Sequence, residues 1–82
     1  MKGEKAIDLI FDELAKAELK HPSFPKDPIH MAAIMAEEAG EAVKASIDMV
    51  YHSGNVADLM LEVAQTGAMA IRILMQFEEF DL

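Results

Sequence analysis

Helix-breaking residues are confined to two short segments of this 82-residue chain, and that distribution limits its fold more than any other feature. All three prolines lie within residues 21–28, and a Ser-Gly-Asn turn occupies residues 53–55. Apolar residues recur at helical spacing between the breaks, and Asp27 and Asn55 are suitable N-cap residues. The pattern predicts three helices, at about residues 4–20, 28–52 and 56–79. A single all-α domain spanning residues 1–82 is therefore expected.

The third predicted helix is apolar around nearly its whole circumference. Between Leu59 and Phe77 only five side chains are clearly polar: Glu62, Gln65, Thr66, Arg72 and Gln76. Two helices from the same chain cannot cover such a surface, and a chain of this length buries only about 60–65% of its unfolded surface. A homodimer or homotetramer that completes a larger helical bundle is expected. Gly67 should be a close packing contact, because glycine costs about 1 kcal/mol relative to alanine inside a helix.

Composition excludes several classes of function. Seven basic and fifteen acidic side chains give a net charge of −8, which argues against binding to a nucleic-acid polymer or an anionic membrane. The absence of cysteine excludes a disulfide, a thiolate zinc site and a cysteine nucleophile. No secretory signal is recognisable, and no apolar run approaches the roughly 18–20 residues of a membrane span. The expected location is cytoplasmic.

Two pairs of polar side chains interrupt the apolar stripes of the second and third predicted helices. Glu38 and Glu41 continue the apolar face of the second helix, and Glu62 and Gln65 lie three residues apart on the third. A charge in an apolar seam is costly unless it is paired or binds a cation, and few basic residues lie nearby. Side chains three residues apart hold their Cβ atoms roughly 5–6 Å apart, so two carboxylates can share one ion.

An antiparallel arrangement of the second and third helices would bring Glu62 to the same centre as Glu38 and Glu41. Mg²⁺, or Mn²⁺ in its place, suits such an oxygen-rich site. The ion would orient a phosphate chain and lower the pKa of an attacking water, which predicts phosphoanhydride hydrolysis. Counted from Gly54, however, the two pairs differ in height by about 7 Å. A longer interhelical loop, or the supply of one pair by a second subunit, would remove this mismatch.

These residues resemble the signature of the MazG-like nucleoside triphosphate pyrophosphohydrolases, which is EExxE followed after a spacer by ExxD. Glu37, Glu38 and Glu41 match the first half, and Glu62 matches the first acid of the second half. The run FPKDPIHMAAIMAEEAGEAVKAS is also similar to small members of the family, so the resemblance covers most of the chain. It implies an all-α oligomer that cleaves an NTP or dNTP to the monophosphate and pyrophosphate with Mg²⁺.

Gln65 departs from this pattern, because the family usually has aspartate at that position. A neutral amide still offers a carbonyl oxygen, so one interpretation is a weaker metal site. A second is that Asp58, together with Glu37, supplies further ligands, although Asp58 also lies three residues after Asn55, where it would stabilise the start of the helix. A third is a non-catalytic helical oligomer or a nucleotide-binding regulatory module.

Three further residues are candidates for substrate binding. Arg72 and Lys44 could hold phosphate oxygens, and Arg72 falls seven residues after Gln65 on the same helical face. Phe24, in the proline-rich segment, could stack on a base. Each has an ordinary structural alternative. A helical arginine with acidic neighbours commonly forms an ion pair, and a loop aromatic commonly pins its loop to the core.

Overall fold

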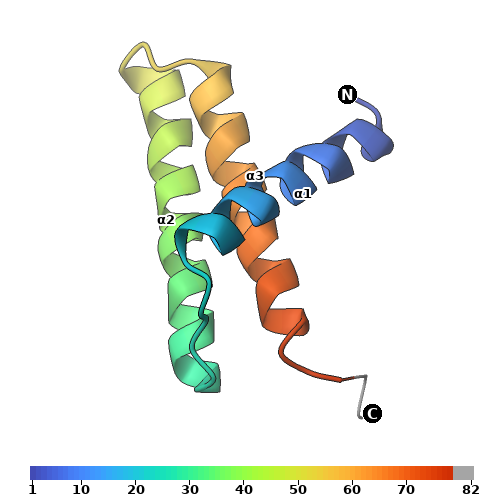
Figure 1. The fold of residues 1–82 in the computed structure, drawn as a ribbon. Coiled ribbons are helices and arrows are strands. Elements are labelled where there is room, and N and C mark those ends of the chain that lie inside the picture. The colour runs from blue at the N-terminus through green and yellow to red at the C-terminus, as the bar shows by residue number, and fades with distance from the viewer. Residues whose placement is uncertain (79–82) are drawn as a thin grey trace.

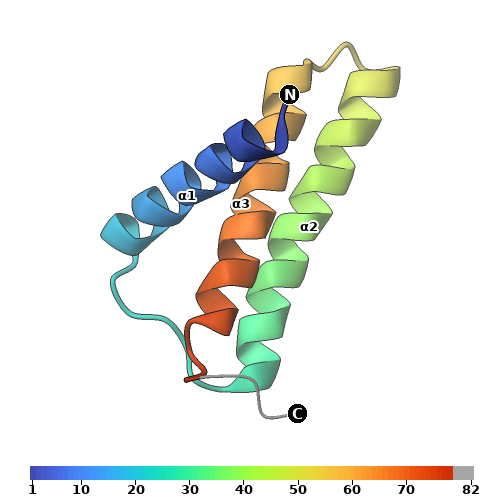
Figure 2. The same ribbon diagram turned by 90° about the vertical axis from the view of Figure 1, so that its right-hand side faces the viewer.

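The computed structural model describes residues 1–78, and in that part of the chain all regular secondary structure is helical. The three helices are α1 (Gly3–Lys20), α2 (Pro28–Tyr51) and α3 (Val56–Leu74). The prediction of an all-α, three-helix chain is thus confirmed. Helices α2 and α3 form an antiparallel hairpin, and α1 crosses it at a steep angle and packs on α3 (Figures 1 and 2). No helix within the described residues is long and apolar enough to cross a membrane.

The N-termini of α2 and α3 are capped as the sequence predicts. The Asp27 side chain accepts a hydrogen bond from the backbone N–H of His30 at 2.9 Å, and Pro28 follows as the first helical residue. At α3, the Asn55 side chain accepts from the backbone N–H of Asp58, also at 2.9 Å. Each cap satisfies a backbone donor that the helix itself leaves without a partner. These local contacts fix where the two long helices begin.

The turn between α2 and α3 contains residues 52–55, and its left-handed residue is Ser53, with φ of 61°. Gly54 then donates its backbone N–H to the carbonyl oxygen of Asp48 at 2.8 Å. A Cβ atom at Gly54 would lie 2.9 Å from the backbone carbonyl carbon of Asp48, so glycine is required here by the close approach of two chain segments. The predicted left-handed turn is present and lies within the expected three residues.

Helix α3 ends at Leu74, earlier than the predicted end at Glu79, which itself lies outside the described residues. Starting at Gln76, backbone hydrogen bonds join residues three apart instead of the four of an α-helix. The backbone N–H of Gln76 donates to the carbonyl of Ile73 at 3.0 Å, and its side-chain amide donates to the carbonyl of Arg72 at 3.1 Å. A side chain that satisfies a carbonyl near the helix end replaces the bond that another helical turn would supply.

The core of the chain is small and centres on α3. Leu14 of α1 packs with Ala68 and Met69 of α3 in one buried cluster. The predicted packing role of Gly67 is confirmed, because a Cβ atom at this position would lie only 3.0 Å from Cδ1 of Ile10. The absence of a side chain at Gly67 therefore lets α1 approach α3 closely. This approach sets the position of α1 over the hairpin.

Candidate metal and nucleotide site

Glu38, in the middle of α2, has a carboxyl group whose pKa is raised above its ordinary value of 4.5. Partial burial is the largest cause, since it disfavours the charged form. The charges of Glu62, Glu41 and Glu37 add to the effect. Glu62 belongs to α3, so the hairpin brings carboxylates of both helices within electrostatic reach of one another. One subunit achieves this with a turn of four residues, despite the difference in height expected from the sequence.

Two shallow grooves connect the acidic side chains. Glu41 and Glu62 line a groove of about 200 Å³ between α2 and α3, together with Asp58 and Lys44. Lys44 also lines a neighbouring hollow with Glu37, Glu38 and Glu41. The described residues therefore place an exposed lysine beside the acidic group, as a phosphate-binding role would require. Asp58 is exposed, and its backbone N–H is the group that Asn55 caps.

The donor set of these side chains suits a hard divalent cation. Glu38, Glu41 and Glu62 provide carboxylate oxygens and Gln65 an amide oxygen, which are the ligand types that Mg²⁺ and Mn²⁺ prefer. Among residues 1–78, no three side chains of the types His, Cys, Asp and Glu are arranged closely enough to hold a metal ion. The carboxylates are thus electrostatically coupled neighbours rather than a closed coordination cage.

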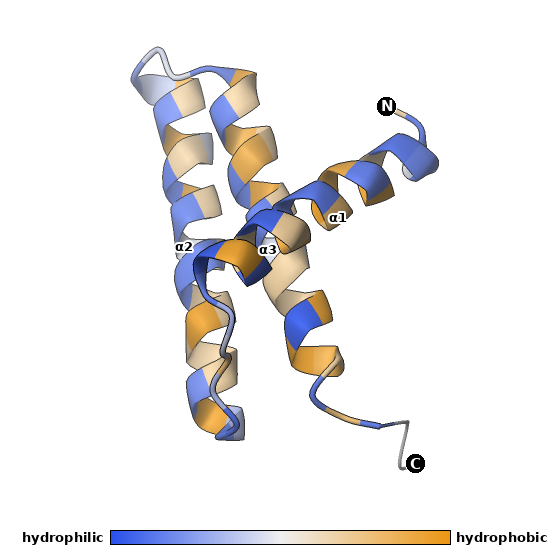
Figure 3. Cartoon of the chain, viewed as in Figure 1, coloured by the Kyte–Doolittle hydropathy of each residue, from blue (hydrophilic) through white to orange (hydrophobic). Residues whose placement is uncertain are grey.

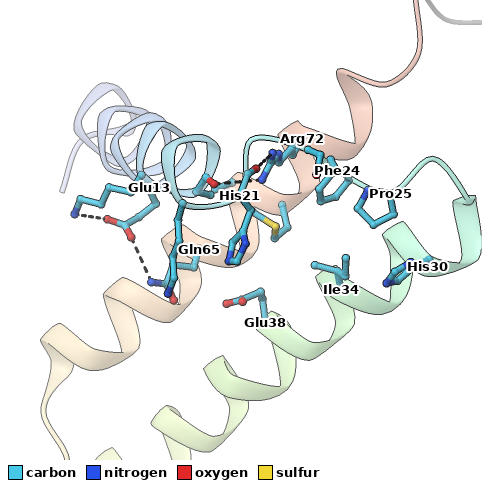
Figure 4. Close-up of a pocket in the computed structure, with 15 residues that line it drawn as sticks. Glu13, His21, Phe24, Pro25, His30, Ile34, Glu38, Gln65 and Arg72 are labelled. Carbon is cyan, nitrogen blue, oxygen red and sulfur yellow. Dashed lines mark hydrogen bonds and ion pairs between the residues drawn. The ribbon is translucent and has the colours of Figure 1, made fainter.

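A larger cavity of about 610 Å³ adjoins the acidic group, between α1, the segment 21–27 and the hairpin (Figure 4). Its volume is typical of small-molecule sites. Glu38 and Gln65 line it, and Ile34, Ala68 and Met69 supply apolar wall. Two histidines, His21 and His30, also line the cavity. This cavity was not predicted from the sequence, because it depends on how α1 crosses the hairpin.

Gln65 contacts Glu13, a residue that was not among the candidates predicted from the sequence. The side-chain nitrogen of Gln65 donates to Oε1 of Glu13 on α1 at 3.3 Å. Glu13 is only 9% exposed, and its Oε2 accepts from the ammonium group of Lys16 at 2.8 Å. A signal for Glu13 was present, because it lies three residues after Ile10 and just before Leu14 on the packed face of α1. An acid on an apolar stripe is also the signal that indicates Glu38.

Arg72 is buried at 5% exposure and binds the carboxyl end of α1. Its guanidinium donates to the backbone carbonyl of Ala17 at 3.4 Å and to that of His21. The positive charge of the guanidinium is also stabilising at this end of α1, because the terminal carbonyl groups form the negative pole of the helix dipole. The Phe24 ring covers the guanidinium, with 4.8 Å between Arg72 Cζ and the ring centroid.

Phe24 also packs against the buried cluster of α1 and α3, so it pins its loop to the core. Both Phe24 and Arg72 still line the large cavity. Their contacts are those of residues that join α1, the loop and α3. Phosphate binding by Arg72 and base stacking by Phe24 stay predictions.

No protein-family model matches the chain, and no curated protein or solved structure matches it either. The structure brings Glu38, Glu41, Glu62 and Lys44 into neighbouring grooves, and Gln65 lines the large cavity with Glu38 and donates to Glu13 on α1.

Proposed function

We propose that this chain is a MazG-like, Mg²⁺-dependent pyrophosphohydrolase that cleaves an NTP or dNTP to the monophosphate and pyrophosphate. The observation that supports it most is the raised pKa of Glu38, caused by burial and by three carboxylates from two helices. Like charges held together in this way raise the free energy of the metal-free protein. A divalent cation would offset that cost more fully than Lys44, whose side chain is exposed.

Glu38, Glu41 and Glu62 would hold the cation, with the carbonyl oxygen of Gln65 as a neutral donor. A bound ion would supply charge neutralisation at the phosphates and a lowered pKa for an attacking water. Lys44 would bind a phosphate oxygen at the exposed rim of the acidic group. The cavity that Glu38 lines would receive the nucleoside, with its apolar wall against the base. Binding both ends of the substrate would align the scissile anhydride with the acidic side chains.

A second candidate function is that of a non-catalytic helical module. The observation that favours it is that two candidate site residues are engaged in helix packing. Gln65 donates to Glu13, and Arg72 donates to carbonyl groups of α1. A chain that had lost catalysis could retain both contacts, since they join α1 to α3. Such a protein would bind a nucleotide, or a partner, without releasing pyrophosphate.

The proposed active form is a homodimer or homotetramer. The chain exposes 6338 Å², whereas a compact monomer of 9.0 kDa should expose only about 4,900 Å². Its radius of gyration of 13.8 Å likewise exceeds the roughly 12 Å expected for a compact domain of this length. A standard interface covers about 800 Å² on each partner. That area is smaller than the difference between the exposed surface of this chain and that of a compact monomer.

Apolar residues occur along all three helices (Figure 3), and those whose side chains are exposed would supply the surface for association. Six that are more than a third exposed are Ile7, Phe11, Val43, Val50, Met60 and Val63. Exposed apolar side chains on this scale are typical of a helical chain that is completed by association. A second copy is the occupant proposed for this surface, since it carries the same apolar helices.

The test of the proposed function is a pyrophosphate-release assay with the eight common NTPs and dNTPs, in the presence of Mg²⁺ or Mn²⁺. Activity is expected from the natural protein with at least one nucleotide. Glu38→Gln and Glu62→Gln should each abolish it while preserving the helical circular dichroism spectrum. Glu18→Gln is the matched control, because Glu18 is an exposed acid of α1 that lines none of the grooves described. Nucleotide binding without pyrophosphate release would favour the non-catalytic module.

A further inference from the structure

The carboxylate of Glu13 holds Gln65 across the interface between α1 and α3. Each of its oxygens has a different partner, with Lys16 on Oε2 at 2.8 Å and Gln65 on Oε1 at 3.3 Å. The Lys16 side chain is 71% exposed, whereas that of Glu13 is 10% exposed. Lys16 therefore contacts the Glu13 carboxylate from the solvent side. Among the described contacts, the one on the side that faces α3 is with Gln65. Figure 4 shows the nitrogen of Gln65 turned toward Glu13, with Glu38 elsewhere around the same cavity.

The charge of the Glu13 carboxylate determines which end of the Gln65 side-chain amide faces it. Glu13 is ion-paired with Lys16, and an ionised carboxylate accepts hydrogen bonds but cannot donate them. Gln65 must therefore present its NH₂ group to Glu13. The carbonyl oxygen of the same planar amide is then directed away from Glu13. A glutamine without such a partner could rotate its amide by 180° and present hydrogens instead of a lone pair.

We propose that Glu13 is a positioning residue, which orients the Gln65 amide so that its carbonyl oxygen serves as a ligand for the divalent cation. This inference rests on the proposed function, because it assigns Glu13 to the same site. It explains how a neutral amide supplies a ligand at this position. Metal-ligating groups are commonly held in this manner by a second hydrogen-bonded residue.

Mn²⁺ affinity measures the effect of Glu13 without dependence on turnover. Titration of Mn²⁺, followed by electron paramagnetic resonance, would compare the natural protein with Glu13→Met, Gln65→Ala and the double variant. Glu13→Met should weaken Mn²⁺ binding about tenfold, the lower end of the effect typical for such partners. In the Gln65→Ala background the same change should have no further effect, because Glu13 acts through Gln65. Glu18→Gln removes one charge from α1 and should leave the affinity unchanged.

Glu13→Gln keeps the inference testable if Glu13→Met does not fold. Its amide retains an acceptor oxygen but permits both orientations of Gln65, so its Mn²⁺ affinity should lie between those of the natural protein and Gln65→Ala. If Glu13→Met lowers Mn²⁺ affinity equally in the natural and Gln65→Ala backgrounds, Glu13 does not act by orienting Gln65. Its negative charge would then affect the ion directly. Unchanged affinity in all Glu13 variants would overturn the inference and leave the proposed function standing. If the natural protein binds no Mn²⁺, the proposed function fails and the inference with it.

Side-chain amide signals in nuclear magnetic resonance provide a readout that needs neither metal nor substrate. The sequence contains two glutamines, Gln65 and Gln76, and one asparagine, so few such signals have to be assigned. In the natural protein, the Gln65 NH₂ signals should be displaced from the positions of a solvent-exposed amide, because the group donates to Glu13. Glu13→Met should move the Gln65 signals and leave those of Gln76 unchanged. Gln65 signals at the position of a solvent-exposed amide, insensitive to Glu13, would overturn the inference.

Discussion

Glu62 on α3 lies close enough to Glu38 on α2 for its charge to raise the pKa of the Glu38 carboxyl group. The two residues belong to different helices of the hairpin, so their proximity is a property of the fold. The folded protein consequently holds the Glu38 proton more tightly than the unfolded chain does. Folding and protonation at this position are therefore linked, and metal binding should be linked to both.

The stability of the metal-free protein should depend on pH through Glu38. Because the pKa of Glu38 is raised on folding, the folded state binds more protons than the unfolded state between the ordinary value of 4.5 and the raised value. The contribution of Glu38 to stability is then fully present below 4.5 and is lost as the pH rises through this window. Glu38→Gln should match the natural protein near pH 4 and be more stable at pH 7 without metal. Urea unfolding at both pH values measures the difference, and a less stable variant at pH 7 would show that Glu38 makes a structural pair.

Arg72 should be more important for stability than its position near the site suggests. Arg72→Met removes the partly buried hydrogen bonds to the carbonyl groups of Ala17 and His21, and a hydrogen bond that involves a charged group contributes about 1.5–3 kcal/mol. We expect a loss of about 2 kcal/mol or more in urea unfolding. Lys44→Met, at an exposed position, should change stability by no more than about 0.5 kcal/mol. Unchanged stability of Arg72→Met, combined with weaker nucleotide binding, would instead assign Arg72 to phosphate.

The N-caps and the Gly67 contact could be predicted from the sequence because each has a local signature. Asp27 before Pro28 and Asn55 after Gly54 are recognisable without knowledge of the tertiary fold. Glu13 and Arg72 differ, since their partners lie more than 50 residues away in the sequence. Helical periodicity indicates which face of α1 is packed, but it does not give the crossing angle that places Glu13 beside Gln65. The cavity next to Glu38 depends on the same crossing and was missed for the same reason.

The glycines of α2 and α3 should respond differently to alanine. A methyl group added at Gly40 would have no neighbouring atom within 4 Å, so Gly40→Ala should gain about 0.5–1 kcal/mol from helix propensity. At Gly67 the new methyl would lie 3.0 Å from Ile10, and overpacking should cancel or exceed that gain. Ile10→Ala should restore the gain at Gly67, which a double-mutant cycle in urea would reveal. A destabilised Gly40→Ala would show that a second subunit packs on that face of α2.

Association and folding should be coupled, because the chain exposes more surface than a compact monomer of its mass. The melting temperature is expected to rise with protein concentration, and sedimentation should give a dimer or tetramer at micromolar concentration. Val63→Glu, which places a charge on an exposed apolar position of α3, should weaken association. Lys5→Glu, at an exposed polar position of α1, provides a charge-changing control. A monomer whose melting temperature does not change on dilution would contradict the proposed oligomer.

Gln65→Asp distinguishes the proposed enzyme from the non-catalytic alternative. Its effect on stability should depend on Glu13, which contacts residue 65. Aspartate removes the N–H donor and places a second carboxylate near Glu13, so the metal-free variant should be less stable than the natural protein at pH 7. Mg²⁺ should restore part of that stability, because the new carboxylate adds an anionic ligand. Adding Glu13→Gln to Gln65→Asp should relieve the repulsion and raise the metal-free stability again, since an amide can donate to the new aspartate.

The same variants decide the question of activity. If the natural site is catalytic, Gln65→Ala should lower pyrophosphate release by removing an oxygen ligand, and Gln65→Asp should bind Mg²⁺ more tightly. If the chain is a degenerate relative, the natural protein should release no pyrophosphate from any of the eight nucleotides, and Gln65→Asp should acquire detectable release. An inactive natural protein beside an active Gln65→Asp variant would refute the enzyme assignment. The resemblance to the MazG-like family would then apply to the fold alone, because a shared helical scaffold does not by itself carry the chemistry of its site.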